Sequence, residues 1–137
     1  MERVNIPGHS PFEPTVGYSR AVRVGPHVFV SGTAPIAADG SDPPDDAYGQ
    51  MRLCLDIALG ALARAGARPE DVVRTRIFLT EPAEFDEIGR AHGEVFGEIR
   101  PASAAVVVKA LLDPSWRVEI ELDALIGSGD GGKIGPG

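Results

Sequence analysis

The segment from Arg117 to Ala124 alternates between polar and apolar residues at every position. Side chains two residues apart on a strand point to the same face of a sheet. The pattern therefore predicts a strand, Arg117–Ile126, in a sheet that buries only one of its faces. The apolar face carries Val118, Ile120, Leu122, Ala124 and Ile126, and the charged face carries Arg117, Glu119, Glu121 and Asp123.

The row of acidic residues on this strand is typical of a face in contact with water. If another copy of the chain covers that face instead, at least one carboxylate must pair with an arginine or be protonated, because an unpaired buried charge is too costly. The candidate partners are Arg74, Arg76 and Arg117.

The rest of the chain predicts further strands and two helices. Gly25-Pro26 separates two β-rich runs, which is typical of a hairpin, and apolar residues recur at helical spacing in two later segments. Gly66 suits the left-handed position that ends the first helix. The predicted elements are the hairpin strands Tyr18–Val24 and His27–Thr33, the loop Pro35–Ala47, the helix Tyr48–Ala65, the strand Val72–Thr80, the helix Ala83–Glu98, and the strand Ala104–Leu112 before Arg117–Ile126.

This order of elements predicts an α+β fold with a mixed sheet and two helices on one face. Residues 1–126 are expected to form a single domain, and the Gly-rich tail 127–137 is expected to be disordered because it has too few apolar residues to bury. No third helix is available to cover the other face of the sheet. Oligomerisation through that open face is the simplest way to cover it.

Composition excludes several classes of function. A net charge of −7 repels polyanions, so nucleic acid is not an expected partner. The three histidines and the single cysteine, Cys54, lack metal-ligand spacing, so no metal is expected. The lone cysteine suits a reducing compartment, and no signal peptide or membrane-spanning run is evident, so a cytoplasmic protein with no membrane partner is expected.

A few polar residues are candidates for chemistry. His92 lies in the apolar stripe of the second predicted helix, where a packed histidine with one hydrogen bond and a general acid or base are both possible interpretations. Ser31-Gly32-Thr33 ends a hairpin strand and offers two hydroxyls beside a glycine that permits close approach or a bulge. Tyr18 offers a phenol, although a strand tyrosine with its hydroxyl in water is the commoner state.

Several ordered motifs resemble the Rid/YjgF family over residues from about 15 to 126. They are YSRAV at 18–22, VFVSGT at 28–33, GAxxEDVVRTRIFLT at 66–80, RPA at 100–102 and VEIEL at 118–122. The resemblance implies a chorismate-mutase-like fold, a homotrimer whose sheets form a central barrel, and clefts between subunits. In the best-known branch these clefts hydrolyse reactive imines and enamines without a cofactor.

The chain departs from that branch at one important position. The family's substrate-clamping arginine, in a P-A-R-S context, is replaced by Ser103, and a hydroxyl cannot form the bidentate pair of a guanidinium with a carboxylate. The family's water-positioning glutamate matches Glu119 and its pocket tyrosine matches Tyr18. An asparagine and a tyrosine of the second helix align with Gly89 and His92.

These observations predict a homotrimeric, cofactor-free enzyme that acts on a small imine, enamine or carbonyl metabolite, but not a standard 2-iminoacid deaminase. Glu119 would be the water-positioning base and His92 its acid or base partner. The predicted substrate-binding residues are Tyr18, Ser31, Gly32, Thr33, Gly89 and Ser103. The alternative is a non-catalytic trimer that binds a small molecule or a protein, and a third hypothesis is a ribonuclease, against which the acidic charge argues.

Overall fold

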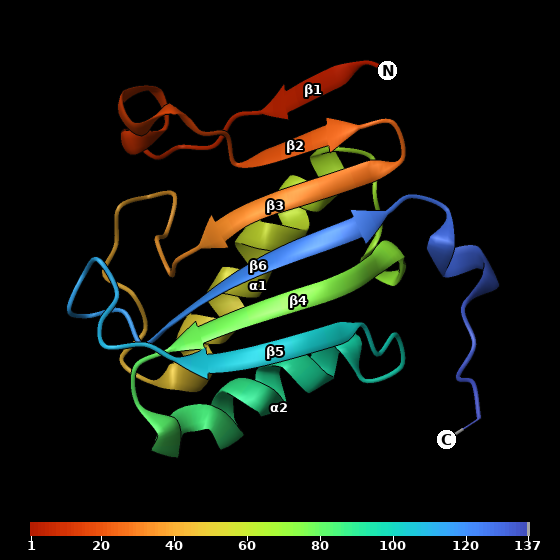
Figure 1. The fold of residues 1–137 in the computed structure, drawn as a ribbon. Helices are drawn as coiled ribbons and strands as arrows, with labels where there is room; N and C mark the ends of the chain where they lie inside the picture. The colour runs from red at the N-terminus through yellow and green to blue at the C-terminus, as the bar shows by residue number, and fades with distance from the viewer. Residues whose placement is uncertain (137) are drawn as a thin grey trace.

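A computed structural model describes residues 1–136 and contains one six-stranded sheet with two helices on one face (Figure 1). The strands lie in the order β1-β2-β3-β6-β4-β5. In chain order the elements are β1 (Arg3–Ile6), β2 (Ala21–Val24), β3 (His27–Thr33), α1 (Ala47–Arg64), β4 (Val72–Leu79), α2 (Phe85–Phe96), β5 (Ala102–Val107) and β6 (Val118–Leu125), with short helical turns at Glu13–Gly17, Pro69–Asp71, Pro82–Glu84 and Ser128–Gly131.

The sheet is mixed, as the sequence predicted. β4 and β5 pair in parallel, and every other neighbouring pair is antiparallel. A parallel pair needs a crossover connection, which α2 provides between β4 and β5. The predicted α+β class with two helices on one sheet face is confirmed.

The apolar face of β6 forms the centre of the core. Val118, Ile120 and Leu122 have no exposed surface. They pack beneath α1, which buries Met51 and Leu55 completely. Burial of a large aliphatic side chain contributes about 1.5–3 kcal/mol, so this layer between sheet and helix supplies much of the stability.

Both ends of α1 have the local chemistry that the sequence favours. Asp46 caps the first turn by accepting a hydrogen bond from the Gly49 amide at 3.1 Å. Gly66 follows the last turn with a φ of 95°, so the predicted left-handed glycine is confirmed.

The N-terminus contains a strand for which the sequence analysis made no prediction. Arg3–Ile6 forms strand β1, which pairs only with β2 at the edge of the sheet. A short π-helical turn, Glu13–Gly17, then leads into Tyr18. A four-residue strand is too short to show a clear period of two, which is why the sequence did not reveal it.

The beginning of the tail also differs from the expected disorder. The amides of Gly127 and Gly129 donate to Asp71 Oδ1 at 3.2 and 3.1 Å, and Arg68 pairs with Asp130 at 2.7 Å. Hydrogen bonds to a buried carboxylate thus hold residues that have no apolar area to bury. Residue 137, the end of the predicted disordered tail, lies outside the described residues.

The open face of the sheet carries the charged row of β6. Arg76 on β4 pairs with Glu121 at 3.3 Å and with Asp123 at 3.1 Å, so one of the three candidate arginines is a partner. Phe29 and Val106 lie on the same face and are 48% and 47% exposed. Within residues 1–136, no helix has the length and apolar character needed to span a bilayer.

Candidate functional site

A cavity of about 840 Å³ opens beside the charged face of β6. Its walls come from the segment before β2, the end of β3, the start of β6 and the loop that precedes β6. Most of the larger side chains in the wall are apolar or aromatic. The lining residues are Ser10, Phe12, Val16, Tyr18, Arg20, Ser31, Gly32, Ala34, Ile36, Leu112, Asp113, Trp116, Glu119 and Glu121.

Glu119 is the half-buried carboxyl group in this wall. Burial raises its pKa above the ordinary glutamate value and Glu121 adds to the rise, whereas Arg20 opposes it. A Cβ atom on Gly32 would lie 2.9 Å from Glu119 Oε2, so only glycine leaves the carboxylate its present position. A carboxylate with a raised pKa accepts a proton more readily than a carboxylate with the ordinary pKa.

Arg20 is a residue of this cavity that sequence reasoning missed. Its Nη2 donates to the Gly32 carbonyl at 2.6 Å, and the guanidinium lies near both Glu13 and Glu119. Burial lowers the pKa of Arg20, and the neighbouring acidic groups oppose that effect. The predicted strand Tyr18–Val24 was the available signal, because it places Arg20 on the same face as Tyr18. In the structure, β2 begins only at Ala21.

Two predicted hydroxyl groups line the cavity but are already hydrogen-bonded. Tyr18 donates its phenol to Ser10 Oγ at 3.1 Å, and Ser31 donates to the Ser19 carbonyl at 2.6 Å. Both groups keep lone pairs that can accept a further hydrogen bond.

Thr33, a predicted substrate-binding residue, does not reach the cavity. The β3–β6 register shifts between Val30 and Thr33, and beyond this bulge Thr33 pairs with Ile120 on the helix-facing side. Its side chain is completely buried and donates to the Ser31 carbonyl at 2.8 Å. The structure therefore does not support Thr33 as a ligand contact of this cavity, because the bulge turns the end of β3 toward the core.

His92 on α2 and Ser103 on β5 lie in a second group, joined through Thr75 on β4, and Gly89 lies on α2 three residues before His92. His92 Nε2 is 2.9 Å from Thr75 Oγ1, and Thr75 donates to Ser103 Oγ at 2.7 Å. Burial lowers the pKa of His92, which favours the uncharged form of its imidazole. Gly89 leaves space beside the ring of Phe85, one helical turn before His92.

The two groups lie on opposite faces of the sheet within one protomer. Thr75 pairs with Leu122, which faces the helices, whereas Glu119 projects from the other face of β6. Glu119 and His92 therefore do not meet within one protomer, because alternate residues on paired strands point in opposite directions. Their predicted convergence was in a cleft between subunits, and it remains a prediction.

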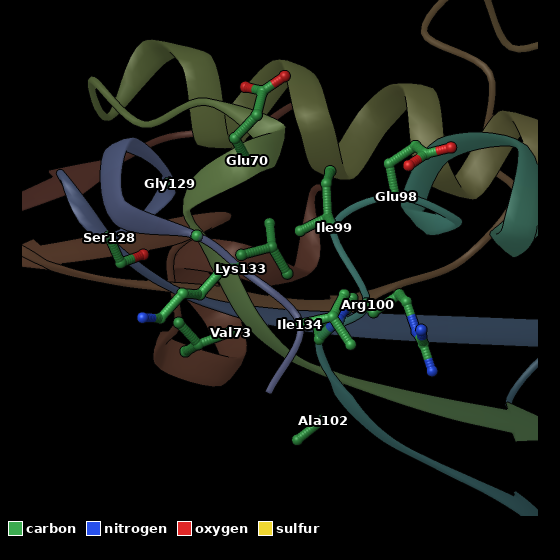
Figure 2. Close-up of a pocket in the computed structure, with 13 residues that line it drawn as sticks. Glu70, Val73, Glu98, Ile99, Arg100, Ala102, Ser128, Gly129, Lys133 and Ile134 are labelled. Atoms are coloured by element: carbon green, nitrogen blue, oxygen red, sulfur yellow. The ribbon is translucent and has the colours of Figure 1, made fainter. Parts of the chain in front are cut away.

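A second pocket, of about 550 Å³, lies where the C-terminal tail passes the start of β4 and β5 (Figure 2). Glu70, Glu98, Arg100 and Lys133 place charges of both signs around it. None of the predicted site residues lines it. Within residues 1–136, no group of three or more histidine, cysteine or acidic side chains is arranged to hold a metal ion.

Comparison with known proteins gives a consistent result over most of the chain. The family described as Endoribonuclease L-PSP matches residues 8–126. The uncharacterized protein SCO2049 of Streptomyces coelicolor is 36% identical over 121 residues, covering 88% of this chain and 90% of that protein. The putative reactive intermediate deaminase TdcF of Escherichia coli is 29% identical over 111 residues, covering 79% of this chain and 85% of that protein.

Solved structures agree with these sequence matches. Rv2704 of Mycobacterium tuberculosis, a member of the YjgF/YER057c/UK114 family, superposes with a TM-score of 0.84 at 44% identity, covering 91% of this chain and all of that one. E. coli TdcF with bound serine gives a TM-score of 0.75 at 26% identity, covering 88% and 92% of the two chains. The chain therefore belongs to the Endoribonuclease L-PSP family, the Rid/YjgF group that its sequence motifs resemble.

Proposed function

We propose that the chain is a cofactor-free homotrimeric hydrolase that acts on a small imine, enamine or related carbonyl compound in clefts between its subunits. The observation that carries this proposal is the half-buried Glu119 carboxyl, with a raised pKa, in the wall of a largely apolar cavity. The name of the related TdcF, a putative reactive intermediate deaminase, supports the same class of reaction.

Glu119 and His92 lie on opposite faces of the sheet, which supports a site that a second copy of the chain completes. The α2–β5 edge carries His92 and Ser103, and all six residues of β5 are exposed in the protomer. The open sheet face beside it also exposes Phe29 and Val106. Closure of this edge of one copy onto the Glu119 cavity of the next would bring the two groups together.

The proposed reaction is the hydrolysis of a carbon–nitrogen double bond. Glu119 holds a water molecule and accepts one of its protons while the water oxygen bonds to the imine carbon. The imine nitrogen gains a proton as the carbinolamine forms. A second proton then reaches that nitrogen, and ammonia or an amine leaves as the carbinolamine hydroxyl loses its proton, so both protons of the water end on the nitrogen product. A carbonyl compound remains, and His92 of a neighbouring copy serves as the acid and base on the nitrogen side.

The charges around the cavity support a substrate without a carboxylate. Glu119, Glu121 and Asp113 are the acidic lining residues, and Arg20 is the only basic residue among the described residues that line it. Ser103 cannot provide the missing bidentate cation. A neutral or cationic imine with an apolar flank suits this lining better than an amino-acid-derived imine.

A complementation experiment tests the composite cleft. Glu119→Gln and His92→Ala chains should each be inactive as homotrimers in an assay of ammonia release from small imines. After unfolding and co-refolding in equal amounts, about one quarter of the clefts should contain both native groups and recover activity. A site within one protomer would recover none.

Two other outcomes would indicate the alternatives. Ligand binding without any turnover by the native protein would favour a non-catalytic trimer. Salt-dependent RNA binding followed by cleavage would favour a ribonuclease, against which the net charge of −7 argues.

A further inference from the structure

The side chains of Ser103, Thr75 and His92 form a continuous hydrogen-bonded chain. Thr75 Oγ1 lies 2.9 Å from His92 Nε2 and 2.7 Å from Ser103 Oγ. Thr75 is completely buried, whereas Ser103 lies on the exposed edge strand β5. These hydrogen bonds therefore connect a shielded imidazole to a hydroxyl group that a ligand can reach.

The chemistry of the three groups permits proton transfer in both directions. A hydroxyl can donate one hydrogen bond and accept others, and a neutral imidazole donates from one nitrogen and accepts at the other. With the imidazole proton on Nε2, His92 donates to Thr75, Thr75 donates to Ser103, and the Ser103 proton is free for a ligand. With the proton on Nδ1, the two hydroxyls rotate and every bond reverses.

A threonine that serves only the core would not need this arrangement. Thr33, the other fully buried threonine named above, bonds only to the backbone carbonyl two residues before it in sequence. Thr75 instead connects α2 to β5, and its partner Ser103 occupies the position at which the family's best-known branch carries a charged clamp.

We propose that Ser103, Thr75 and His92 form a proton relay in which Ser103 contacts the substrate and His92 acts through it. This inference rests on the proposed hydrolytic function. Ser103 accepts the proton that the carbinolamine hydroxyl loses and passes its own to Thr75, and Thr75 passes its own to His92 Nε2. Both hydroxyls are restored and an imidazolium remains. The same steps in reverse protonate the leaving nitrogen. Thr75 and His92 are thus positioning residues for Ser103.

The relay also restricts the substrate. A single uncharged hydroxyl forms one hydrogen bond to an imine nitrogen, a carbonyl oxygen or a hydroxyl group, whereas a carboxylate would require compensation of its full charge. The substrate atom that meets Ser103 is therefore neutral in the ground state, in agreement with the acidic lining of the Glu119 cavity.

The first test is spectroscopic and needs no substrate. In the ¹⁵N NMR spectrum of the native trimer, Thr75→Val should shift the Nε2 resonance of His92 and its titration midpoint. Ser103→Ala should also shift both, although Ser103 does not touch His92. Thr33→Val is the matched control, since it removes a buried threonine hydroxyl elsewhere and should change neither. An unchanged His92 resonance in Ser103→Ala would overturn the relay.

The second test uses turnover. Thr75→Val and Ser103→Ala should each lower kcat at least tenfold with little change in KM, and the limb of the pH profile that reports His92 should disappear. Ser103→Thr should recover activity because it keeps the hydroxyl. Native kcat and pH profile in Thr75→Val would refute the relay. If the native protein hydrolyses no imine, the proposed function fails, and the NMR result still decides whether the hydrogen-bonded chain couples Ser103 to His92.

Discussion

The half-buried position of Glu119 affects stability as well as reactivity. Burial raises its pKa, so the folded protein favours the neutral acid more than the unfolded chain does. The stability associated with this group is complete below its ordinary pKa and is lost as the pH rises through the raised folded-state value. When Glu119 is ionised in this half-buried position, it lowers the free energy of unfolding, although the ionised form is the one that can accept a proton.

Glu119→Gln should therefore stabilise the fold at about pH 7 while abolishing turnover. The amide has the same shape and cannot ionise, so the desolvation cost disappears. Urea unfolding at several pH values measures the effect, and the gain should vanish below about pH 4, where both chains are neutral at this position. A variant less stable than the native protein at about pH 7 would show that the Arg20 interaction outweighs desolvation.

At the residue scale, regular alternation predicted the site only where the strand is regular. Glu119 follows directly from the pattern of β6 and lines the cavity. Thr33 does not line the cavity, because the β3 bulge turns its side chain toward the core. Arg20 was missed because its contacts come from segments distant in sequence, which a pattern along one strand does not show.

At the scale of elements, both helices were predictable because their buried faces follow the helical period and glycine or proline lies near their ends. Strand β1 was not predictable, since a four-residue strand gains its stability only by pairing with β2. The start of β5 was placed two residues too late, at Ala104 in place of Ala102, because small residues carry little periodic signal.

Helix α1 offers a test of these local rules. Gly60 is exposed on the helix, and a Cβ added there would meet no neighbouring atom, so Gly60→Ala should stabilise the protein by about 1 kcal/mol. Gly66→Ala should instead destabilise the protein, because φ is +95° and a Cβ would lie 2.6 Å from Arg23 Nη1. Thermal unfolding of both variants measures the difference. A loss of stability in Gly60→Ala would mean that this face of α1 packs against another copy of the chain.

At the scale of the whole molecule, the exposed sheet face and β5 predict association. The native protein should have a mass of about three times 14.4 kDa in sedimentation velocity. Val106→Glu places a charge on this face and should give smaller species, whereas Ala63→Glu, on the exposed side of α1, should keep the native mass. A native mass of one chain would contradict the trimer, and an unchanged mass in Val106→Glu would contradict its assembly through this face.

The fold was predictable from the sequence to a greater extent than the assembly. Periodicity and motif order specify which residues of one chain pack together, and the structure confirms them. Periodicity indicates that one sheet face is open but not what covers it, because the pattern of apolar residues in one chain does not identify the partner surface. The pairing of cavity and relay from two copies therefore remains a prediction.

The ion pairs of Arg76 with Glu121 and Asp123 have a consequence for how copies would meet. Each chain compensates part of the acidity of its own sheet face before contact, which reduces the repulsion between two such faces despite the acidic character of the whole protein. Ionic strength should then have little influence on the association constant. Catalytic competence would depend on protein concentration far more than on the salt content of the surroundings.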